Sequence, residues 1–223
     1  MEEWLQPGPR MAAAVIAVLA GGALLTQFGL DIVERGRDPA GEVAHLAGWF
    51  TIWSNTMVAL IASHAGLMGR ARGPSHPALL AASAAWIVVV GVVYNTLLAH
   101  LNHPPTLARQ LIDQVFHTVM PLAWPAWWLW GRPAGALRWR HLAAVLPLPL
   151  AYCAFSLWVG GQTGRYAYFF IDVARYGWGQ VTLNIIGLAA FFVGLMAAAI
   201  AWDRRGAPAA APDAGKAGSA AKG

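Results

Sequence analysis

Charged side chains are scarce in this sequence. Only 11% of the 223 residues are Asp, Glu, Lys or Arg, whereas a soluble domain normally carries about 25%. This shortage excludes a soluble globular domain that water surrounds on all sides. Cysteine is nearly absent as well, and the lone Cys153 excludes an internal disulfide. We interpret this thiol as a small apolar filler within a helix.

Apolar residues make up 58% of the chain and gather in long runs. A helix needs about 20 such residues to cross a hydrocarbon core of roughly 30 Å. The predicted fold class is therefore all-α, an integral membrane bundle that occupies residues 1–202. Residues 203–223 are rich in Ala, Gly and Pro, and we expect them to form a disordered cytoplasmic tail. Six runs are expected to be transmembrane helices: 11–30, 46–68, 78–101, 111–130, 141–161 and 180–202.

The distribution of Lys and Arg predicts the orientation of these helices. Ten of the fifteen basic residues fall in the termini and in the loops on the same side as the termini, and five fall on the other side. Because basic loops stay inside, both termini are predicted to be cytoplasmic. The formal charge of +5 matches a surface that faces anionic headgroups. We therefore expect a membrane as the partner of these charges, and no nucleic acid.

Polar residues within the predicted spans gather in one leaflet. Polar groups inside a membrane are costly and often functional. At 1.5 Å per residue, Thr51 and His117 both lie roughly 8–9 Å below the outer interface. The inner halves of the spans are almost entirely apolar, so the pattern predicts a pocket that opens outward and not a channel. The polar layer comprises Thr26, Gln27, Thr51, Ser54, Asn55, Tyr94, Asn95, His117, Ser156, Gln180 and Asn184.

The spacing of these residues suggests an ester hydrolase. Asp113 and His117 are four residues apart, which stacks a carboxylate one helical turn from an imidazole and suggests a general base. A hydroxyl from Thr51 would then be the nucleophile, and no metal is required. The expected catalytic set is Thr51, His117 and Asp113. Substrate-binding or oxyanion roles are expected for Asn55, Asn95, Asn184, Ser54 and Tyr94.

Structural interpretations stand beside these roles. A threonine in a membrane helix commonly bonds a carbonyl of its own helix, and asparagines commonly join neighbouring helices. Asp113 lies close enough to the interface to be simply solvated. His100 and His103, three residues apart, could bind a metal, or they could be exposed polar residues at the end of a span.

Three segments resemble the androgen-induced-gene and androgen-dependent TFPI-regulating proteins, above all their bacterial six-span relatives. The first is Phe50-Thr51-Ile52-Trp53-Ser54-Asn55, and the second runs from Asp113 through His117 to Pro121. The third runs from Gly164 to Asp172, and Asn184 follows it. The resemblance extends over the six predicted spans and excludes the tail. The order and spacing of the three segments support it.

This resemblance implies an activity. Animal members of the family are integral-membrane hydrolases of fatty acid esters of hydroxy fatty acids, and they use a Thr nucleophile and a His without a cofactor. The resemblance places these roles at Thr51 and His117. It implies a membrane lipid or lipid-derived ester as substrate and a bacterial inner membrane as location.

Two other classes of function compete with the hydrolase hypothesis. The chain could be a structural or signalling membrane protein without chemistry. It could also bind haem or a metal through His100 or His103 together with His117, although haem usually needs paired axial ligands. A transporter would need polar groups at mid-membrane and an internal repeat, and the sequence shows neither convincingly. The oligomeric state stays open.

Overall fold

The computed structural model describes residues 5–69, 73–132 and 134–205, and every regular element within them is helical. Short helical turns connect or extend the longer helices: η1 (Gly73–Ser75), η2 (Tyr94–Leu98), η3 (Ala99–Leu101), η4 (Val115–Val119), η5 (Trp139–Val145) and η6 (Phe169–Ile171). The α-helices are α1 (Pro7–Arg35), α2 (Pro39–Ala47), α3 (Phe50–Met68), α4 (Pro77–Val93), α5 (Leu107–Gln114), α6 (Met120–Gly131), α7 (Pro147–Thr163) and α8 (Val173–Arg205).

The all-α prediction is confirmed for the described residues. Four stretches are long and apolar enough to cross a membrane: Pro7–Arg35, Pro77–Leu101, Trp139–Thr163 and Val173–Arg205. A fifth is added if α2 and α3, which meet at a 100° bend, count as one span. The remaining predicted span, 111–130, is helical but less apolar, because it carries Asp113, Gln114 and His117 as well as two prolines and four tryptophans. Length and composition indicate a multi-pass membrane protein with four to five candidate spans.

The helical domain extends beyond the expected boundary at residue 202. Helix α8 continues to Arg205, and Asp203 is fully buried. Its carboxylate accepts a hydrogen bond of 2.8 Å from the backbone N–H of Leu137 and lies 3.1 Å from Arg132 Nε. A buried carboxylate needs such partners, so these contacts attach the end of α8 to the connection between α6 and η5. The rest of the predicted tail, 206–223, lies outside the described residues.

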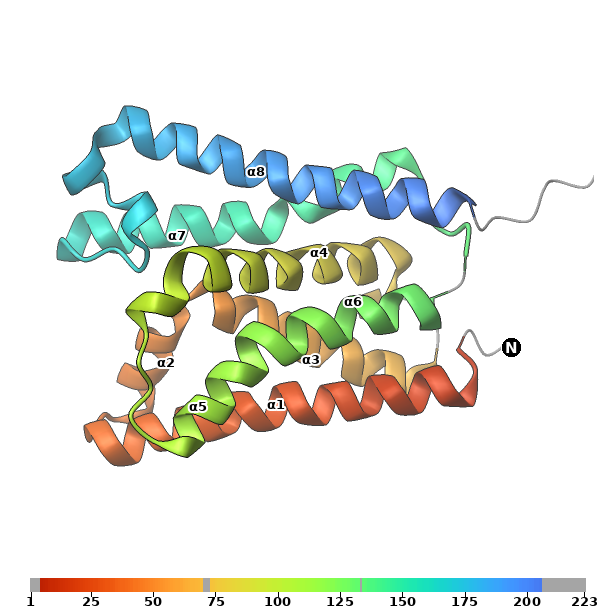
Figure 1. Cartoon of the computed structure of the whole chain (residues 1–223), viewed down its shortest axis with the longest axis horizontal. Helices are drawn as coiled ribbons and strands as arrows, with labels where there is room; N and C mark the ends of the chain where they lie inside the picture. Colours follow the sequence, from red (N-terminus) through yellow and green to blue (C-terminus); the bar gives the residue numbers. More distant parts are fainter. Residues whose placement is uncertain (1–4, 70–72, 133, 206–223) are drawn as a thin grey trace, which may run out of the picture.

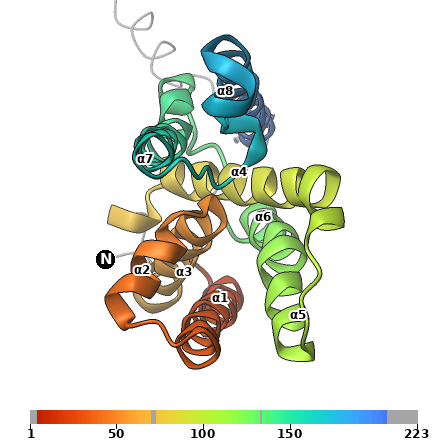
Figure 2. The ribbon, with the colours of Figure 1, turned by 90° about the vertical axis from the view of Figure 1, so that its left-hand side faces the viewer.

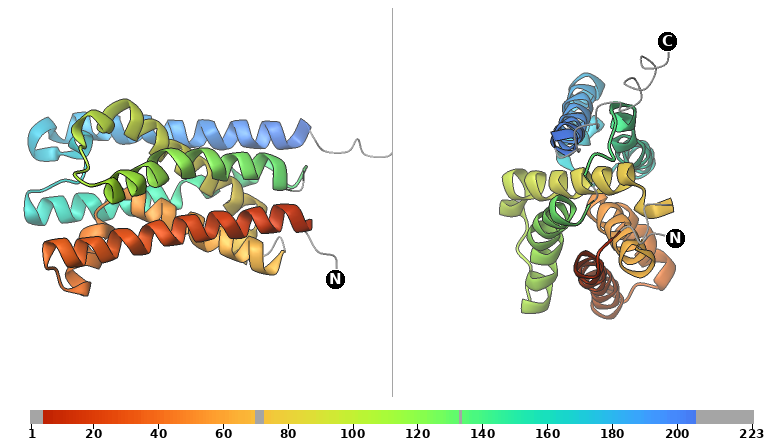
Figure 3. Two further views of the ribbon diagram at one scale, coloured as in Figure 1. Left: turned by 60° about the horizontal axis from the view of Figure 1, so that its bottom comes forward. Right: turned by 90° about the vertical axis from the view of Figure 1, so that its right-hand side faces the viewer.

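The long helices run mostly along one axis and form an up-and-down bundle (Figure 1). The first turn of α1 and the last turn of α8 lie at the same end, and α2 and α5 lie at the other. Seen along the axis, α4 separates the α7–α8 pair from α1, α3 and α6 (Figures 2 and 3). In agreement, 72% of its apolar stretch is buried, against 17–22% in the three other single-helix candidates.

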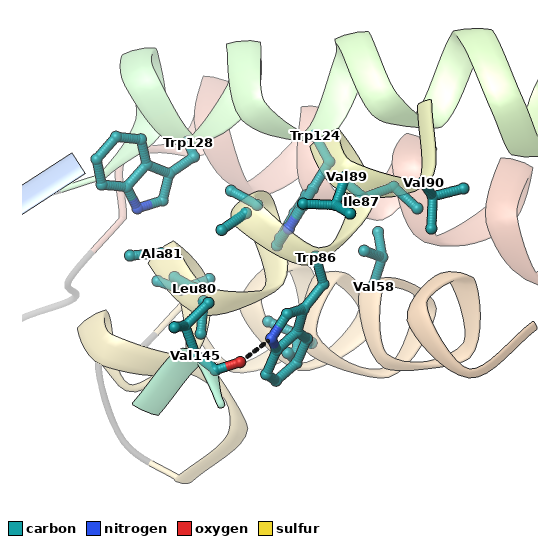
Figure 4. Packing of buried hydrophobic residues seen from close by; sticks show 14 of the residues in the cluster. Val58, Leu80, Ala81, Trp86, Ile87, Val89, Val90, Trp124, Trp128 and Val145 are labelled. Carbon is teal, nitrogen blue, oxygen red and sulfur yellow. Dashed lines mark hydrogen bonds between the residues drawn. The ribbon is translucent and has the colours of Figure 1, made fainter. Parts of the chain in front are cut away.

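Small residues allow close packing around α4. Without a hydrophobic drive between helices in lipid, such packing and interhelical hydrogen bonds hold a bundle together. Trp86 Nε1 donates to the carbonyl of Val145 at 2.7 Å (Figure 4). Trp124 Nε1 donates to Ser83 Oγ at 2.9 Å. Both indole N–H groups are thereby satisfied within the core, as buried tryptophans require.

The outer faces of the bundle are apolar. Val18 is 73% exposed and Leu25 74% exposed on α1, and Leu183 is 63% exposed on α8. Soluble proteins rarely expose apolar surface over whole helix faces. These faces are suited to contact with lipid chains.

Candidate active site

The bend between α2 and α3 positions Thr51. Trp53 Nε1 donates to the carbonyl of Ala47 at 2.8 Å, and the hydroxyl of Tyr152 donates to that of Gly48 at 2.7 Å. Both acceptors lie at the end of α2, where carbonyls have no partner within the helix. Thr51 is consequently the second residue of α3. The predicted span 46–68 is therefore not one straight helix, because α2 and α3 meet at a 100° bend.

Two π-helical turns carry other polar residues of the predicted site. Tyr94 begins η2 and His117 is the middle residue of η4; such turns often occur at functional sites. Pro121 has no N–H with which to bond the His117 carbonyl in a regular helix. Asn95 Nδ2 donates to that carbonyl at 3.0 Å and to the Gly91 carbonyl at 2.8 Å. The amide therefore joins the two turns and holds the backbone that carries His117.

Thr51, His117 and Asp113 form a continuous hydrogen-bonded chain. Thr51 Oγ1 lies 3.2 Å from His117 Nε2. On the other side of the ring, Nδ1 lies 3.0 Å from Asp113 Oδ1 and 3.1 Å from the Asp113 carbonyl oxygen. These two oxygens only accept, so Nδ1 carries the proton of the neutral ring and Nε2 accepts from the Thr51 hydroxyl. This arrangement places a base directly at a hydroxyl.

Asp113 is held by two further donors. The Tyr94 hydroxyl lies 2.8 Å from both carboxylate oxygens, and Asn102 Nδ2 lies 2.9 Å from Oδ1 and 2.8 Å from the Tyr94 hydroxyl. The Tyr94 ring also stacks on the His117 ring, with centroids 3.6 Å apart and planes 9° from parallel. The side chains of Asp113 and His117 are each only 13% exposed. Packing and hydrogen bonds thus restrict the imidazole to one orientation.

Tyr168 brings a second hydroxyl to Thr51. Its oxygen accepts from the backbone N–H of Phe50 at 3.1 Å and lies within hydrogen-bonding reach of the side chain and backbone of Thr51. Phe50 and Thr51 are the first two residues of α3, and N–H groups at a helix N-terminus favour negative charge. The Phe50 N–H in the first turn of α3 is therefore taken up by Tyr168 and holds that hydroxyl beside Thr51.

Two cavities meet at Thr51. The larger has a volume of about 560 Å³ and is lined by polar and charged groups that include His117, Asp113, Arg109 and Asp31. The smaller, the apolar pocket, has a volume of about 90 Å³ and lies among α4, α7 and α8. Four residues line both cavities: Thr51, Tyr94, Leu98 and Tyr168. The larger cavity has the size typical of small-molecule sites, roughly 300–1,000 Å³.

The remaining predicted site residues bond to backbone carbonyls. Ser54 Oγ donates to the Phe50 carbonyl at 2.9 Å, and Asn55 Nδ2 donates to that of Thr51 at 2.9 Å. Asn184 Nδ2 donates to the carbonyl of Phe170, in η6, at 2.7 Å. None of these three side chains, nor Asn95, lines either cavity. They hold the helices that carry the site, and the geometry gives them no contact with the space beside Thr51.

The competing hypothesis of a metal site is not supported by a cluster of ligand side chains in the described part of the chain. Within residues 5–69, 73–132 and 134–205, no group of three or more His, Cys, Asp or Glu side chains could hold a metal ion. His103 lines the larger cavity, whereas His100 does not.

Two residues of this site were missed by reasoning from the sequence. Asn102 lies in the connection between η3 and α5, and no periodicity marked it. Tyr168 lies within the 164–172 segment that carried the family resemblance. This segment lies between two predicted helices, so helical periodicity could not predict which way its side chain points or how deep it lies in the membrane. Both became visible only through their contacts with Asp113 and Thr51.

Comparison with protein-family models, curated proteins and solved structures finds no match for this chain.

Proposed function

We propose that this protein is an integral-membrane carboxylic ester hydrolase of lipid or lipid-derived esters. Thr51 is the nucleophile, His117 the general base and Asp113 the residue that orients the imidazole. The observation that carries the proposal is the Thr51–His117–Asp113 chain at the junction of two cavities. The resemblance to the androgen-induced-gene family supports the same pair of residues. Fatty acid esters of hydroxy fatty acids are the substrate class that this resemblance favours.

In the first half of the reaction, Thr51 Oγ1 attacks the ester carbonyl carbon while its proton passes to His117 Nε2. The charge that develops on the carbonyl oxygen is stabilised by the Tyr168 hydroxyl, which the N–H of Phe50 holds in place. The bond to the alkoxy oxygen then breaks, and the proton on Nε2 goes to that oxygen. The alcohol leaves, and the acyl group stays on Thr51 as an ester.

The second half mirrors the first. Water from the larger cavity gives a proton to Nε2 and attacks the acyl carbon. The bond to Thr51 Oγ1 breaks, and the proton returns to that oxygen. Asp113 stabilises the imidazolium that forms in each half. The products are a carboxylic acid and an alcohol, and the enzyme is restored.

The proposal includes the membrane arrangement. Six spans place both termini in the cytoplasm and the Thr51–His117 pair in the outer leaflet. This is supported by the Lys and Arg distribution and by the shared position of the two ends of the helical domain in Figure 1. A bacterial inner membrane is the location that the family resemblance favours.

Labelling with a fluorophosphonate probe, followed by peptide mapping, tests the chemistry. We expect modification of Thr51 that is lost in His117→Ala. Thr26→Ala is a matched control, because Thr26 Oγ1 donates to the Gly22 carbonyl at 2.8 Å and is exposed; it should label like the wild type. Equal labelling of Thr51→Ala would refute the assignment of the nucleophile.

The role of Asp113 is tested on ester hydrolysis. Asp113→Asn should lower kcat by about 10²-fold or more without abolishing it, because the wrong tautomer of a catalytic histidine has cost up to about 10⁴-fold in a serine protease. Asp172→Asn is the control: Asp172 Oδ1 accepts the Arg175 N–H at 3.0 Å near the start of α8, and Asn replaces Asp well at a helix start. A pH–rate profile of Asp113→Asn identical to that of the wild type would remove Asp113 from the mechanism.

A further inference from the structure

The apolar pocket has a defined direction. Thr51 and Tyr168 lie at one end of it, together with Tyr94 and Leu98. From there it follows α8 inward from Ile185 to Phe192, a length of roughly 10 Å at 1.5 Å per residue. Leu150, a lining residue on α7, is 49% exposed, so the pocket also opens at the surface of the bundle. It is a narrow slot between the reacting hydroxyl and the lipid-facing surface.

The two cavities offer different surroundings to the two sides of an ester. The larger cavity combines many apolar residues with the charged side chains of Asp31, Arg109 and Asp113, so it suits a part of the substrate that carries polar groups beside its hydrocarbon. The apolar pocket is lined mostly by Val, Leu, Ile and Phe side chains, which gain free energy when a chain replaces water. A hydrocarbon chain without polar groups that leaves the carbonyl at Thr51 is therefore matched better by the apolar pocket than by the larger cavity.

We propose that the apolar pocket among α4, α7 and α8 is the acyl-chain subsite, and that it holds the methylene groups next to the ester carbonyl of an unbranched fatty acyl chain. The chain continues past Leu150 toward lipid, and the alcohol portion occupies the larger cavity. This inference rests on the proposed function, since it assumes that the carbonyl carbon lies at Thr51.

Two neighbouring alanines on α8 provide the variant and its matched control. Ala189 lines the apolar pocket, whereas Ala190 does not line it and is exposed. In Ala189→Phe the new ring fills the slot. We expect the kcat/KM ratio of 4-nitrophenyl decanoate to 4-nitrophenyl acetate to fall about tenfold or more, the scale on which hydrophobic pockets discriminate chain atoms. In Ala190→Phe the ratio should equal that of the wild type.

Two results for the decanoate-to-acetate ratio would contradict the proposal. If Ala189→Phe keeps the wild-type ratio, or if Ala190→Phe changes it equally, the acyl chain does not lie in this pocket. If the wild type hydrolyses neither ester, or if Thr51→Ala hydrolyses both at the wild-type rate, the proposed function fails instead.

A binding measurement tests the subsite without catalysis. Cys153 is the only cysteine and lines the apolar pocket, so its alkylation by N-ethylmaleimide reports whether the pocket is filled. Palmitate should slow this alkylation at least several-fold in the full-length wild type and equally in Thr51→Ala, while butyrate should not. Unchanged alkylation with palmitate would overturn the proposal even if the protein hydrolyses esters. Protection without any hydrolysis would retain the subsite and reject the enzyme.

Discussion

Thr51 differs from other threonines of this protein in what its hydroxyl can reach. Thr26 and Thr96 each donate to the carbonyl four residues earlier, at 2.8 and 2.7 Å, which is the usual fate of a threonine in a membrane helix. For Thr51 that carbonyl belongs to Ala47, which lies beyond the bend and accepts from Trp53. The hydroxyl is therefore available to His117. The position of the bend therefore leaves the Thr51 hydroxyl able to take the role that we propose for it.

Tyr168→Phe removes the hydroxyl beside Thr51 and keeps the ring. The ring stacks on Phe170 at 5.2 Å between centroids and packs edge-on against Trp49 at 5.8 Å, so the fold should persist. If the hydroxyl stabilises charge on the substrate carbonyl, kcat should fall by about 10- to 10³-fold, with the upper end matching the loss of one oxyanion donor. Ester hydrolysis and fluorophosphonate labelling of the purified variant measure this loss.

Tyr176→Phe is the control for this substitution, because Tyr176 is 39% exposed and lines neither cavity. It should behave as the wild type. An unchanged kcat in Tyr168→Phe, or a KM rise with kcat intact, would exclude Tyr168 from charge stabilisation and leave it a role in packing.

At the scale of helices, periodicity predicted which residues share a face but not how the helices are deformed. The four-residue spacing of Asp113 and His117 placed both on one face, and the structure brings them into contact. The π-turns were not predictable from spacing. One extra residue rotates the following residues by about 100° around the helix, but α4 and α6 are apolar on almost every face, so this rotation leaves no visible change in the pattern. Asn95 donates to the His117 carbonyl, which Pro121 leaves without a partner in its own helix. This contact could not be predicted from the sequence, because the prediction requires knowing which helices are neighbours.

The close approach of α4 to the start of α6 should be sensitive to one methyl group. A Cβ on Gly91 would lie 2.5 Å from Pro121 Cβ, so Gly91→Ala must separate the two π-turns. We expect a destabilisation of about 1–3 kcal/mol, as for other overpacked cores. Hydrolysis should fall as well, because Tyr94 and His117 would move apart. Thermal unfolding followed by tryptophan fluorescence, with ester hydrolysis on the same sample, measures both effects.

Gly194→Ala on α8 is the matched control, since nothing lies within 4 Å of a Cβ placed there. It should keep the wild-type stability or exceed it, because Ala is the better helix former. Equal stability of Gly91→Ala and Gly194→Ala would show that the two turns are not packed as described.

At the scale of the whole molecule, the low charge content and the apolar runs already predicted a helical membrane bundle. What they could not supply is the central place of α4, which depends on its small residues: Ala81 and Ala82 are buried and let neighbouring helices approach. Hydropathy alone also does not decide how many helices cross the membrane. The α5–η4–α6 segment carries the site residues His117 and Asp113, and polar residues of this kind lower the apolar character of a span that they serve.

Counting spans by chemical labelling distinguishes six from five. If α5, η4 and α6 together cross the membrane, the α6–η5 connection lies on the cytoplasmic side and the end of α7 lies outside. Single cysteines at Gln162 and Ala134, both exposed, would be introduced separately into Cys153→Ala. With intact cells, a membrane-impermeant maleimide should label Gln162→Cys and leave Ala134→Cys unlabelled until the cells are opened. Labelling of both positions in intact cells, or of Ala134→Cys alone, would reject the six-span arrangement with both termini in the cytoplasm.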